Sequence, residues 1–187
     1  IKNIISTAGL KYQQRQDLAE NEMSVWLEDL NFSLNYLKEL NTRTDSFLQQ
    51  KLDLRAIGFF GHSFGGAASF NFCAKDLRCK AGLNMDGKIY GYNPKRKSNS
   101  SFLFLLGEES IKTFMTPYES EEDMLKRYSS RKEEKESVQN YLPLMKKLSE
   151  EDKHINLTIL DKINHSGFSD QLLLKDMSPL MNFIDLG

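Results

Sequence analysis

Ser63 has the sequence setting of a nucleophile elbow. It lies in Gly-His-Ser-Phe-Gly-Gly, which contains the Gly-x-Ser-x-Gly pattern with Gly61 and Gly65 on either side. A nucleophile elbow needs a buried strand that runs into a turn so tight that bulky flanking side chains do not fit. A nearly continuous apolar run, residues 54–60, precedes this motif, and the small residues 66–68 begin the segment after the turn. The segment therefore predicts a strand, a sharp turn and a helix, with the Ser63 hydroxyl at the turn.

The motif has two other interpretations. One is an ordinary glycine-rich turn with an exposed serine. The other is a phosphate-binding loop, which fits poorly because neither the Gly-Lys-Ser/Thr ending nor a Gly-x-Gly-x-x-Gly spacing is present. The order of strand, turn and helix favours the nucleophile.

A serine hydroxyl becomes a good nucleophile only when a base takes its proton. The chain has three histidines. We expect His62, inside the elbow, to point away from the Ser63 side chain, and His154 to lie at the far end of the predicted strand 155–160. His165 follows that strand, at the edge where Ser63 should emerge. We therefore predict that His165 is the general base.

A carboxylate must orient the histidine, and two strand ends supply candidates. Asp86 follows the predicted strand 81–85, whereas Glu108 and Glu109 follow the predicted strand 101–106. We favour Asp86, because packing alone does not explain a short carboxylate between a strand end and a glycine. Its alternative role is to cap amides of a local turn. The chain order of serine, acid and histidine agrees with that of α/β-hydrolases.

The elements that would position these residues alternate between strands and helices. This alternation predicts an α/β protein with a mainly parallel sheet, and the nearly continuous apolar strands predict burial on both faces. The helices predicted from the sequence are an amphipathic covering helix at 23–40, a short helical stretch at 47–51, a buried helix at 67–74 and a closing helix at 171–184.

Residues 108–149 are rich in charge and poor in β-branched side chains. We expect a helical insertion here, either a solvated excursion or a lid or partner-docking element. Thr116 is predicted to cap one helix, and Pro143 to start another with Met145 and Leu148 turned inward.

Composition excludes several classes of protein. The chain has 187 residues, a net charge of −1 and 27 % charged residues, so it presents no basic field for nucleic acid. No apolar run approaches the roughly 20 residues of a membrane span, so we expect a soluble protein. Cys73 and Cys79 match no metal-binding spacing. We interpret both as buried apolar side chains, with a local disulfide as the alternative.

Three segments together resemble a known family. Residues 57–67, 82–87 and 165–170 are similar to the group II platelet-activating factor acetylhydrolases (plasma and cytosolic type II) and their bacterial relatives, which are α/β-hydrolases. The His-x-x-Phe-Ser-Asp ending and the acid after this particular strand are more specific than the elbow. The resemblance covers most of residues 50–187.

The resemblance implies a serine esterase that works through an acyl-serine intermediate. Ser63 would be the nucleophile, Asp86 the orienting acid, His165 the general base and then acid, and the Phe64 backbone amide part of the oxyanion hole. It implies a lipid or small-molecule ester as substrate, with short-acyl or oxidised phospholipids foremost, possible peripheral contact with lipid, and no metal or organic cofactor.

The alternatives are a general carboxylesterase, polyesterase or thioesterase, and a binding protein that retains the elbow. Phe168 and Asp170 also match family positions. We interpret Phe168 as packing beneath its loop and Asp170 as the cap of the closing helix.

The family also predicts more chain ahead of this one. Its first strands and the loop with the second oxyanion amide should come earlier, and residues 1–22 do not resemble that loop. We therefore expect residues 1–187 to be the carboxyl-terminal portion of a single α/β-hydrolase domain, not fully active alone. Any signal peptide would precede Ile1. The compartment and oligomeric state are left open.

Overall fold

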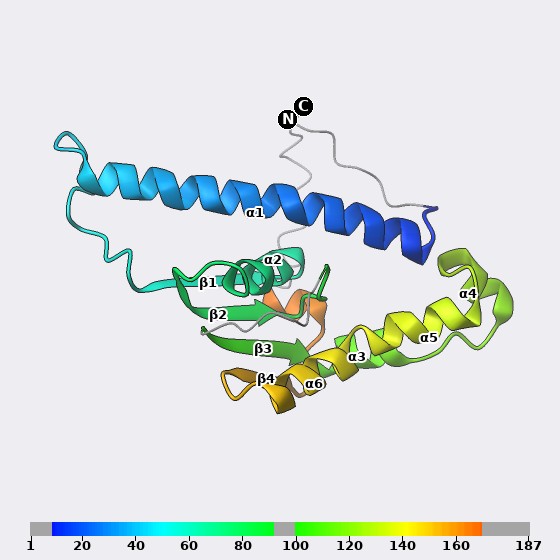
Figure 1. Cartoon of the computed structure of the whole chain (residues 1–187). Coiled ribbons are helices and arrows are strands. Elements are labelled where there is room, and N and C mark those ends of the chain that lie inside the picture. Colours follow the sequence, from blue (N-terminus) through cyan, green and yellow to red (C-terminus); the bar gives the residue numbers. More distant parts are fainter. Residues whose placement is uncertain (1–8, 92–99, 170–187) are drawn as a thin grey trace, which may run out of the picture.

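The computed structural model describes residues 9–91 and 100–169 (Figure 1). The predicted closing helix at 171–184 and the predicted cap Asp170 lie outside these residues. The described elements, in chain order, are α1 Tyr12–Thr42, β1 Ile57–His62, α2 Phe64–Cys73, β2 Cys79–Met85, β3 Ser101–Gly107, α3 Glu108–Met115, α4 Glu121–Arg127, α5 Arg131–Gln139, α6 Leu142–Glu151, β4 Ile155–Leu160 and the 3₁₀ turn η1 His165–Phe168.

The four strands form one sheet in the order β1-β2-β3-β4, and every neighbouring pair is parallel. The register places His62 beside Met85 and Met85 beside Leu105, so the carboxyl ends of β1, β2 and β3 meet at one edge. The predicted α/β architecture is confirmed, and the strand bounds agree with the predicted ranges to within three residues at either end.

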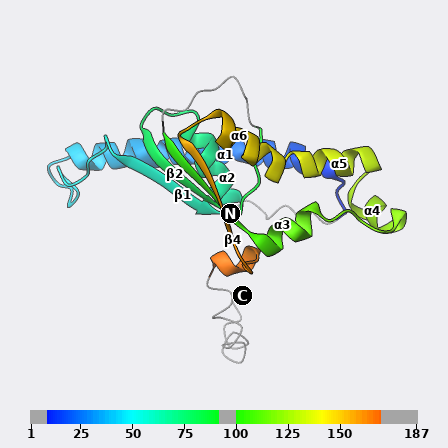
Figure 2. The ribbon, with the colours of Figure 1, turned by 90° about the horizontal axis from the view of Figure 1, so that it is seen from below.

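The main core lies on one face of this sheet. Alternate residues of β3, Phe102, Phe104 and Leu106, are buried against Phe70 of α2 and Met145 of α6. Because alternate side chains of a strand point to the same face, α2 and α6 cover the same side of the sheet. Figure 2 shows the two helices together in one layer beside the strands.

The prediction that the strands are buried on both faces is wrong for the two outer strands of the described sheet, β1 and β4, since Ile159 of β4 is an exposed apolar side chain. Phe60 points away from α2 and is 76 % exposed, whereas its neighbour Phe59 packs against Phe72 with ring centroids 4.4 Å apart. Strand β1 is an outer strand of the described sheet. No helix within residues 9–91 and 100–169 covers Phe60, so an apolar sequence alone did not ensure burial.

Helix α1 extends well beyond the predicted 23–40 and packs on α2. Met23 is buried against Ala67 and Ala68, whose small side chains let the two helices approach closely. The ring of Trp26 meets that of Phe64 edge to face at 5.0 Å. Although α1 has 31 residues, neither it nor any other helix among the described residues is apolar enough to cross a membrane.

Two other local predictions are corrected. Residues 47–51 form turns and not a helix, because the side chain of Asn41 bonds to both the amide and the carbonyl of Leu52 at 3.0 Å. Thr116 ends α3, and its hydroxyl donates to the Lys112 carbonyl. The cap of the next helix is Ser120, whose hydroxyl accepts from the Asp123 amide at 3.0 Å.

The charged segment is helical, as predicted, with α3, α4, α5 and most of α6 within residues 108–149. Pro143 lies in the first turn of α6, and Met145 and Leu148 are buried. These three predictions are confirmed.

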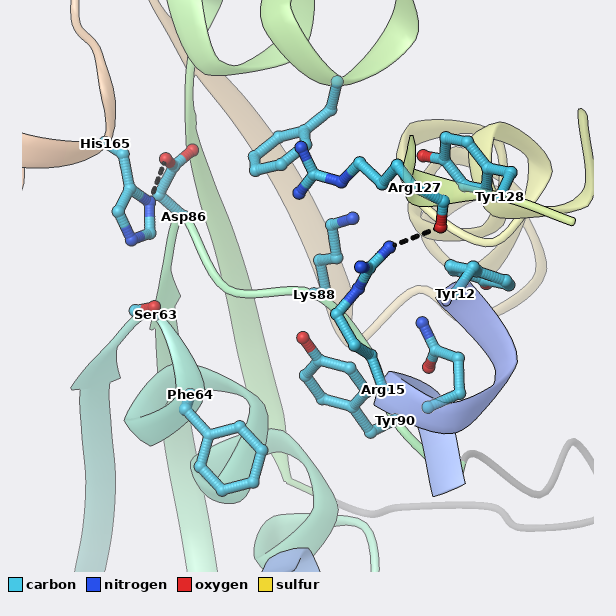
Figure 3. A pocket seen from close by; sticks show the side chains of 12 residues that line it. Tyr12, Arg15, Ser63, Phe64, Asp86, Lys88, Tyr90, Arg127, Tyr128 and His165 are labelled. Carbon is cyan, nitrogen blue, oxygen red and sulfur yellow. Dashed lines mark hydrogen bonds and ion pairs between the residues drawn. The ribbon is translucent and has the colours of Figure 1, made fainter. Parts of the chain in front are cut away.

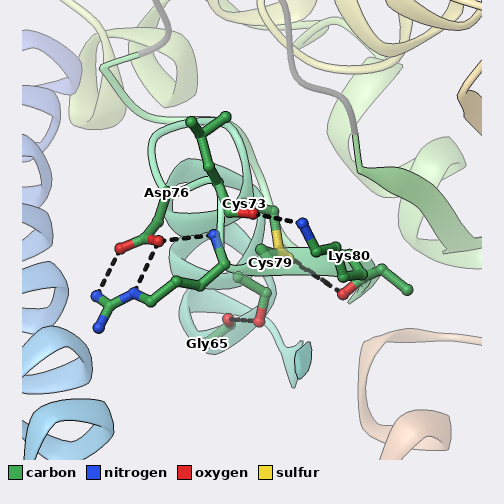
Figure 4. Close-up of a disulfide and its surroundings, with 9 residues drawn as sticks. Gly65, Cys73, Asp76, Cys79 and Lys80 are labelled. Atoms are coloured by element: carbon green, nitrogen blue, oxygen red, sulfur yellow. Dashed lines mark hydrogen bonds and ion pairs between the residues drawn. A yellow bond between two sulfur atoms is a disulfide. The ribbon is translucent and has the colours of Figure 1, made fainter. Parts of the chain in front are cut away.

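The interpretation of the cysteines as two separate apolar side chains is wrong. Cys73 and Cys79 form a disulfide, which was the alternative (Figure 4). Cys73 ends α2 and Cys79 begins β2, and the turn between them brings their Cα atoms to 5.0 Å. Within that turn the Asp76 carboxylate accepts from the Arg78 amide at 2.9 Å, which helps to reverse the chain.

Candidate active site

Ser63 stands on a strained turn between β1 and α2. Its φ of 56° lies in the left-handed region, which costs a residue with a side chain on the order of 1–3 kcal/mol. Its amide donates to the Met85 carbonyl at 2.8 Å, and its carbonyl accepts from the Ala67 amide at 3.1 Å. The turn is therefore tied to β2 on one side and to α2 on the other.

Two of the glycines around Ser63 are required by close backbone approach. A Cβ on Gly61 would lie closer than 3.0 Å to the backbone of Gly65, and one on Gly66 would lie as close to the side chain of Asn84. The expectation that Gly65 also needs to lack a side chain is wrong. A Cβ there would meet only the ring of Trp26, at 3.9 Å, which is an ordinary contact.

Phe64 is the first residue of α2. Amides in the first turn of a helix have no partner within the helix, so the Phe64 amide is available to an anion beside Ser63. Its ring packs against Trp26 and Tyr90, at 5.0 and 5.5 Å between centroids.

A second strained turn, at the end of β2, carries Asp86. Asp86 has a φ of 56°, and the fully buried Asn84 closes the turn: its side chain accepts from the Gly87 amide at 2.7 Å and donates to the Gly87 carbonyl at 3.1 Å. A Cβ on Gly87 would overlap the carbonyl of Ser63. The two turns thus touch backbone to backbone.

Asp86 is 2 % exposed, and both of its carboxylate oxygens are used. Oδ1 accepts from the Gly107 amide at 2.9 Å, and Oδ2 is hydrogen-bonded to Nδ1 of His165 at 2.8 Å. An ionised carboxylate only accepts, so Nδ1 donates to it, and in the neutral imidazole this leaves Nε2 as the acceptor. His165 reaches this position as the first residue of η1, after β4.

Figure 3 shows the unbonded nitrogen of His165 on the side of the ring that faces Ser63. No hydrogen bond joins Ser63 to His165 among the contacts of the described residues. Catalytic hydrogen bonds are often long before a substrate binds, so this geometry is compatible with a serine and its base.

His62 has a role that its sequence position did not reveal. Its Nε2 contacts the backbone carbonyl of His165 at 2.9 Å, and the two rings lie 4.4 Å apart. The ring of Phe168 is 6.1 Å from that of His62, consistent with packing beneath this loop. His154 lies at the other end of the sheet, where its carbonyl accepts from the Phe102 amide at 2.8 Å.

The other candidate carboxylates, Glu108 and Glu109, form ion pairs with Lys112 and not with His165. Glu108 pairs with Lys112 at 3.0 Å and accepts from the Lys162 amide at 3.2 Å. The bond to Lys112, followed by that to Lys162, lowers the pKa of Glu108 to about 2. Glu109 also pairs with Lys112, at 2.8 Å. The structure therefore brings Asp86, and not Glu108 or Glu109, to the histidine.

Ser63, Asp86 and His165 line one cavity of about 220 Å³. The cavity wall also holds side chains that the sequence analysis missed, the cations Arg15, Lys88 and Arg127 (Figure 3). Lys88 could have been noticed as the cation next to Asp86-Gly87, but nothing in the sequence links Arg15 and Arg127 to this place.

Tyr141 is buried near the acid. Burial, followed by the negative charge of Asp86, raises the pKa of its phenol.

A parallel sheet whose strand β1 leads through a strained serine turn into α2 is the architecture of the α/β-hydrolase fold. The chain belongs to the family described as platelet-activating factor acetylhydrolase, isoform II, which matches residues 11–175.

Individual relatives match less of the chain or differ more in sequence. A probable 1-alkyl-2-acetylglycerophosphocholine esterase of Arthroderma benhamiae is 51 % identical over 35 residues, which are 19 % of this chain and 9 % of that protein. A ferulic acid esterase from Streptomyces cinnamoneus has a TM-score of 0.49 at 21 % identity, over 84 % of this chain and 37 % of that one. A siderophore hydrolase from Aspergillus nidulans has a TM-score of 0.44 at 14 % identity, over 78 % and 53 %. The chain thus spans less than two thirds of each of these proteins.

The packing around the elbow predicts different effects for two neighbouring glycines. Gly66→Ala should lower the free energy of unfolding by roughly 1–3 kcal/mol, because the new methyl would collide with the buried side chain of Asn84. Gly65→Ala is the matched control. It adds the same methyl within the same helix, with room for it, and should leave stability unchanged or raise it by up to about 1 kcal/mol. Urea unfolding of both variants checks this, and equal losses would contradict the packing described.

Proposed function

We propose that the chain provides the catalytic side chains of a serine esterase that cleaves carboxylic esters through an acyl-serine intermediate. Ser63 is the nucleophile, Asp86 the orienting acid and His165 the general base. The observation that carries the proposal is the 2.8 Å bond between the buried Asp86 and Nδ1 of His165, at the edge of the cavity where Ser63 stands on its strained turn.

The reaction follows from these positions. Nε2 of His165 takes the hydroxyl proton as Ser63 Oγ attacks the ester carbonyl, and Asp86 stabilises the imidazolium without taking the proton. The Phe64 amide donates to the oxyanion; removal of one such donor typically costs about 10²–10³ in rate. His165 then protonates the departing alcohol, and the acyl-serine forms. In the second half His165 activates a water, which releases the acid and restores Ser63.

For the substrate we propose phospholipid esters with short or oxidised acyl chains. Membership of the acetylhydrolase family supports this, as does the 35-residue match to the Arthroderma relative, a probable 1-alkyl-2-acetylglycerophosphocholine esterase. The cavity of about 220 Å³ is small beside the roughly 300–1,000 Å³ of ordinary small-ligand pockets, which favours a short acyl group.

We also propose that the charged helical segment 108–149 acts as part of the cover of this cavity. Helix α4 supplies Arg127 to the wall, and Tyr128 follows it there. Tyr128 is buried against Tyr12 at the start of α1, with ring centroids 5.6 Å apart. The segment therefore meets α1 in the wall of the cavity, which supports a role as part of its cover.

A pair of substrates tests the lipid proposal. We expect a higher kcat/KM for a short-acyl glycerophosphocholine than for a nitrophenyl ester or an acyl thioester of the same chain length, because the cavity wall carries groups suited to the lipid's phosphate. Initial rates on each substrate, below its aggregation concentration, measure this. A preference for the soluble nitrophenyl ester or the thioester would favour a general carboxylesterase or a thioesterase.

The choice of acid is tested by Asp86→Asn. The asparagine can still accept from the Gly107 amide, so the fold should persist, but it no longer holds the Nδ1–H tautomer of His165. We expect kcat to fall by roughly 10³–10⁴ with little change in melting temperature. Glu108→Gln is the matched control, a carboxylate lost from the neighbouring strand end, and should change kcat by less than about twofold. A larger loss in Glu108→Gln than in Asp86→Asn would reassign the acid.

A further inference from the structure

Three cationic side chains from separate elements meet in the wall of the active-site cavity. Arg15 comes from α1, Arg127 ends α4, and Lys88 lies just beyond the turn at the end of β2 that carries Asp86. Figure 3 shows the two guanidinium groups and the ammonium group turned toward one another on the side of the cavity away from His165. Residues far apart in the chain thus place three positive charges together.

The contacts of Arg15 and Lys88 hold these two side chains in place without neutralising them. Arg15 donates to the carbonyl of Leu10 and, at 2.9 Å, to that of Arg127. The ammonium of Lys88 lies 4.3 Å from the centroid of the Phe114 ring. Every one of these partners is an uncharged group.

No carboxylate pairs with the cluster in the described part of the chain, since none of the ion pairs there includes Arg15, Lys88 or Arg127. Glu133 acts on Arg15 from a distance, but its oxygens accept from the backbone amides of Gln13 and Ser129.

The charged form of Lys88 is destabilised in this setting. Burial, followed by the positive charges of Arg127 and Arg15, lowers the pKa of Lys88 to about 8. Like charges that share a half-buried site without a counter-charge repel one another, and an anion bound between them would relieve that repulsion.

We propose that Arg15, Lys88 and Arg127 form an anion subsite that binds a negatively charged group of the ester substrate and so selects charged esters over neutral ones. The inference rests on the proposed function, because it assigns the subsite to the ester that Ser63 attacks. Arginine and lysine together suit a phosphate or a carboxylate, and the arginine fork can bond to two oxygens at once. The anion is therefore either the phosphodiester of a phospholipid or the terminal carboxylate of an oxidised acyl chain.

Two matched pairs of soluble esters separate these sources of the anion. Diacetylglycerophosphocholine and triacetin share two acetyl esters on glycerol, and the third position carries phosphocholine in the first and a third acetyl ester in the second. Monomethyl glutarate and dimethyl glutarate share a methyl ester but differ in a carboxylate. The quantity of interest in each pair is the ratio of kcat/KM for the charged ester to that for the neutral one, measured at pH 7, where Lys88 is protonated.

We expect Lys88→Met to lower the ratio about tenfold in the pair whose anion the subsite accepts, since a charge-assisted bond is lost. Lys146→Met is the control: it removes one positive charge from an exposed residue that lines neither this cavity nor the one beside it, and should leave both ratios unchanged. Arg127→Gln, at an exposed position, is a second variant in case Lys88→Met unfolds, and it should act in the same direction.

Unchanged ratios in Lys88→Met and Arg127→Gln would overturn the subsite, even if the enzyme hydrolyses esters. If no ester is hydrolysed, the proposed function fails, and the subsite is judged by binding alone. Calorimetric titration of Ser63→Ala with diacetylglycerophosphocholine and with monomethyl glutarate should then show binding of one of them that weakens about tenfold on adding Lys88→Met. Equal affinity with and without Lys88→Met, or no binding of either ester, would refute the subsite independently of catalysis.

Discussion

The contact between two strained turns is the constraint on which the rest of the site depends. One turn carries Ser63 and the other carries Asp86, and Gly87 lets the second lie against the carbonyl of the first. Asn84, buried between them, bonds to both backbone groups of Gly87. Because β1 and β2 are parallel and His62 pairs with Met85 at their carboxyl ends, the two turns lie at the same edge of the sheet. The two turns can approach so closely because Gly87 has no side chain and because the buried side-chain amide of Asn84 has hydrogen-bond partners.

The position of the histidine follows from this contact. Asp86 is anchored by the Gly107 amide on the far side and presents its second oxygen to His165, while His62 holds the backbone of the same loop. The cations of the cavity wall come from α1, α4 and the segment after β2, so they depend on packing between helices and not on the sheet. The sheet thus positions Ser63, Asp86 and His165, whereas packing between helices positions the cations of the proposed anion subsite.

The sequence predicted what is local. The ends of the strands and the glycines around Ser63 can be recognised from short stretches of sequence. So can Asp86 and His165, which each follow a strand. These signals predicted that the three side chains lie at one edge of the sheet. The sequence did not predict contacts between distant segments: Arg15 and Arg127 lie 112 positions apart, and no pattern marks either as part of a cavity. The apolar run of β1 predicted burial, yet exposure of Phe60 depends on which elements cover that face. The disulfide between Cys73 and Cys79 depends on the turn that brings the two residues together, and their spacing in the sequence did not predict that turn.

The central claim is that Ser63 is an activated nucleophile served by His165 and Asp86. Its most direct measurement is the reaction of the folded protein with a fluorophosphonate probe, followed by peptide mass spectrometry to locate the adduct. We expect a single adduct on Ser63, formed at a rate that falls sharply in Asp86→Asn and is lost in the heat-unfolded protein. A folded protein in which Ser63 stays unlabelled, or in which another residue carries the adduct, would contradict the account.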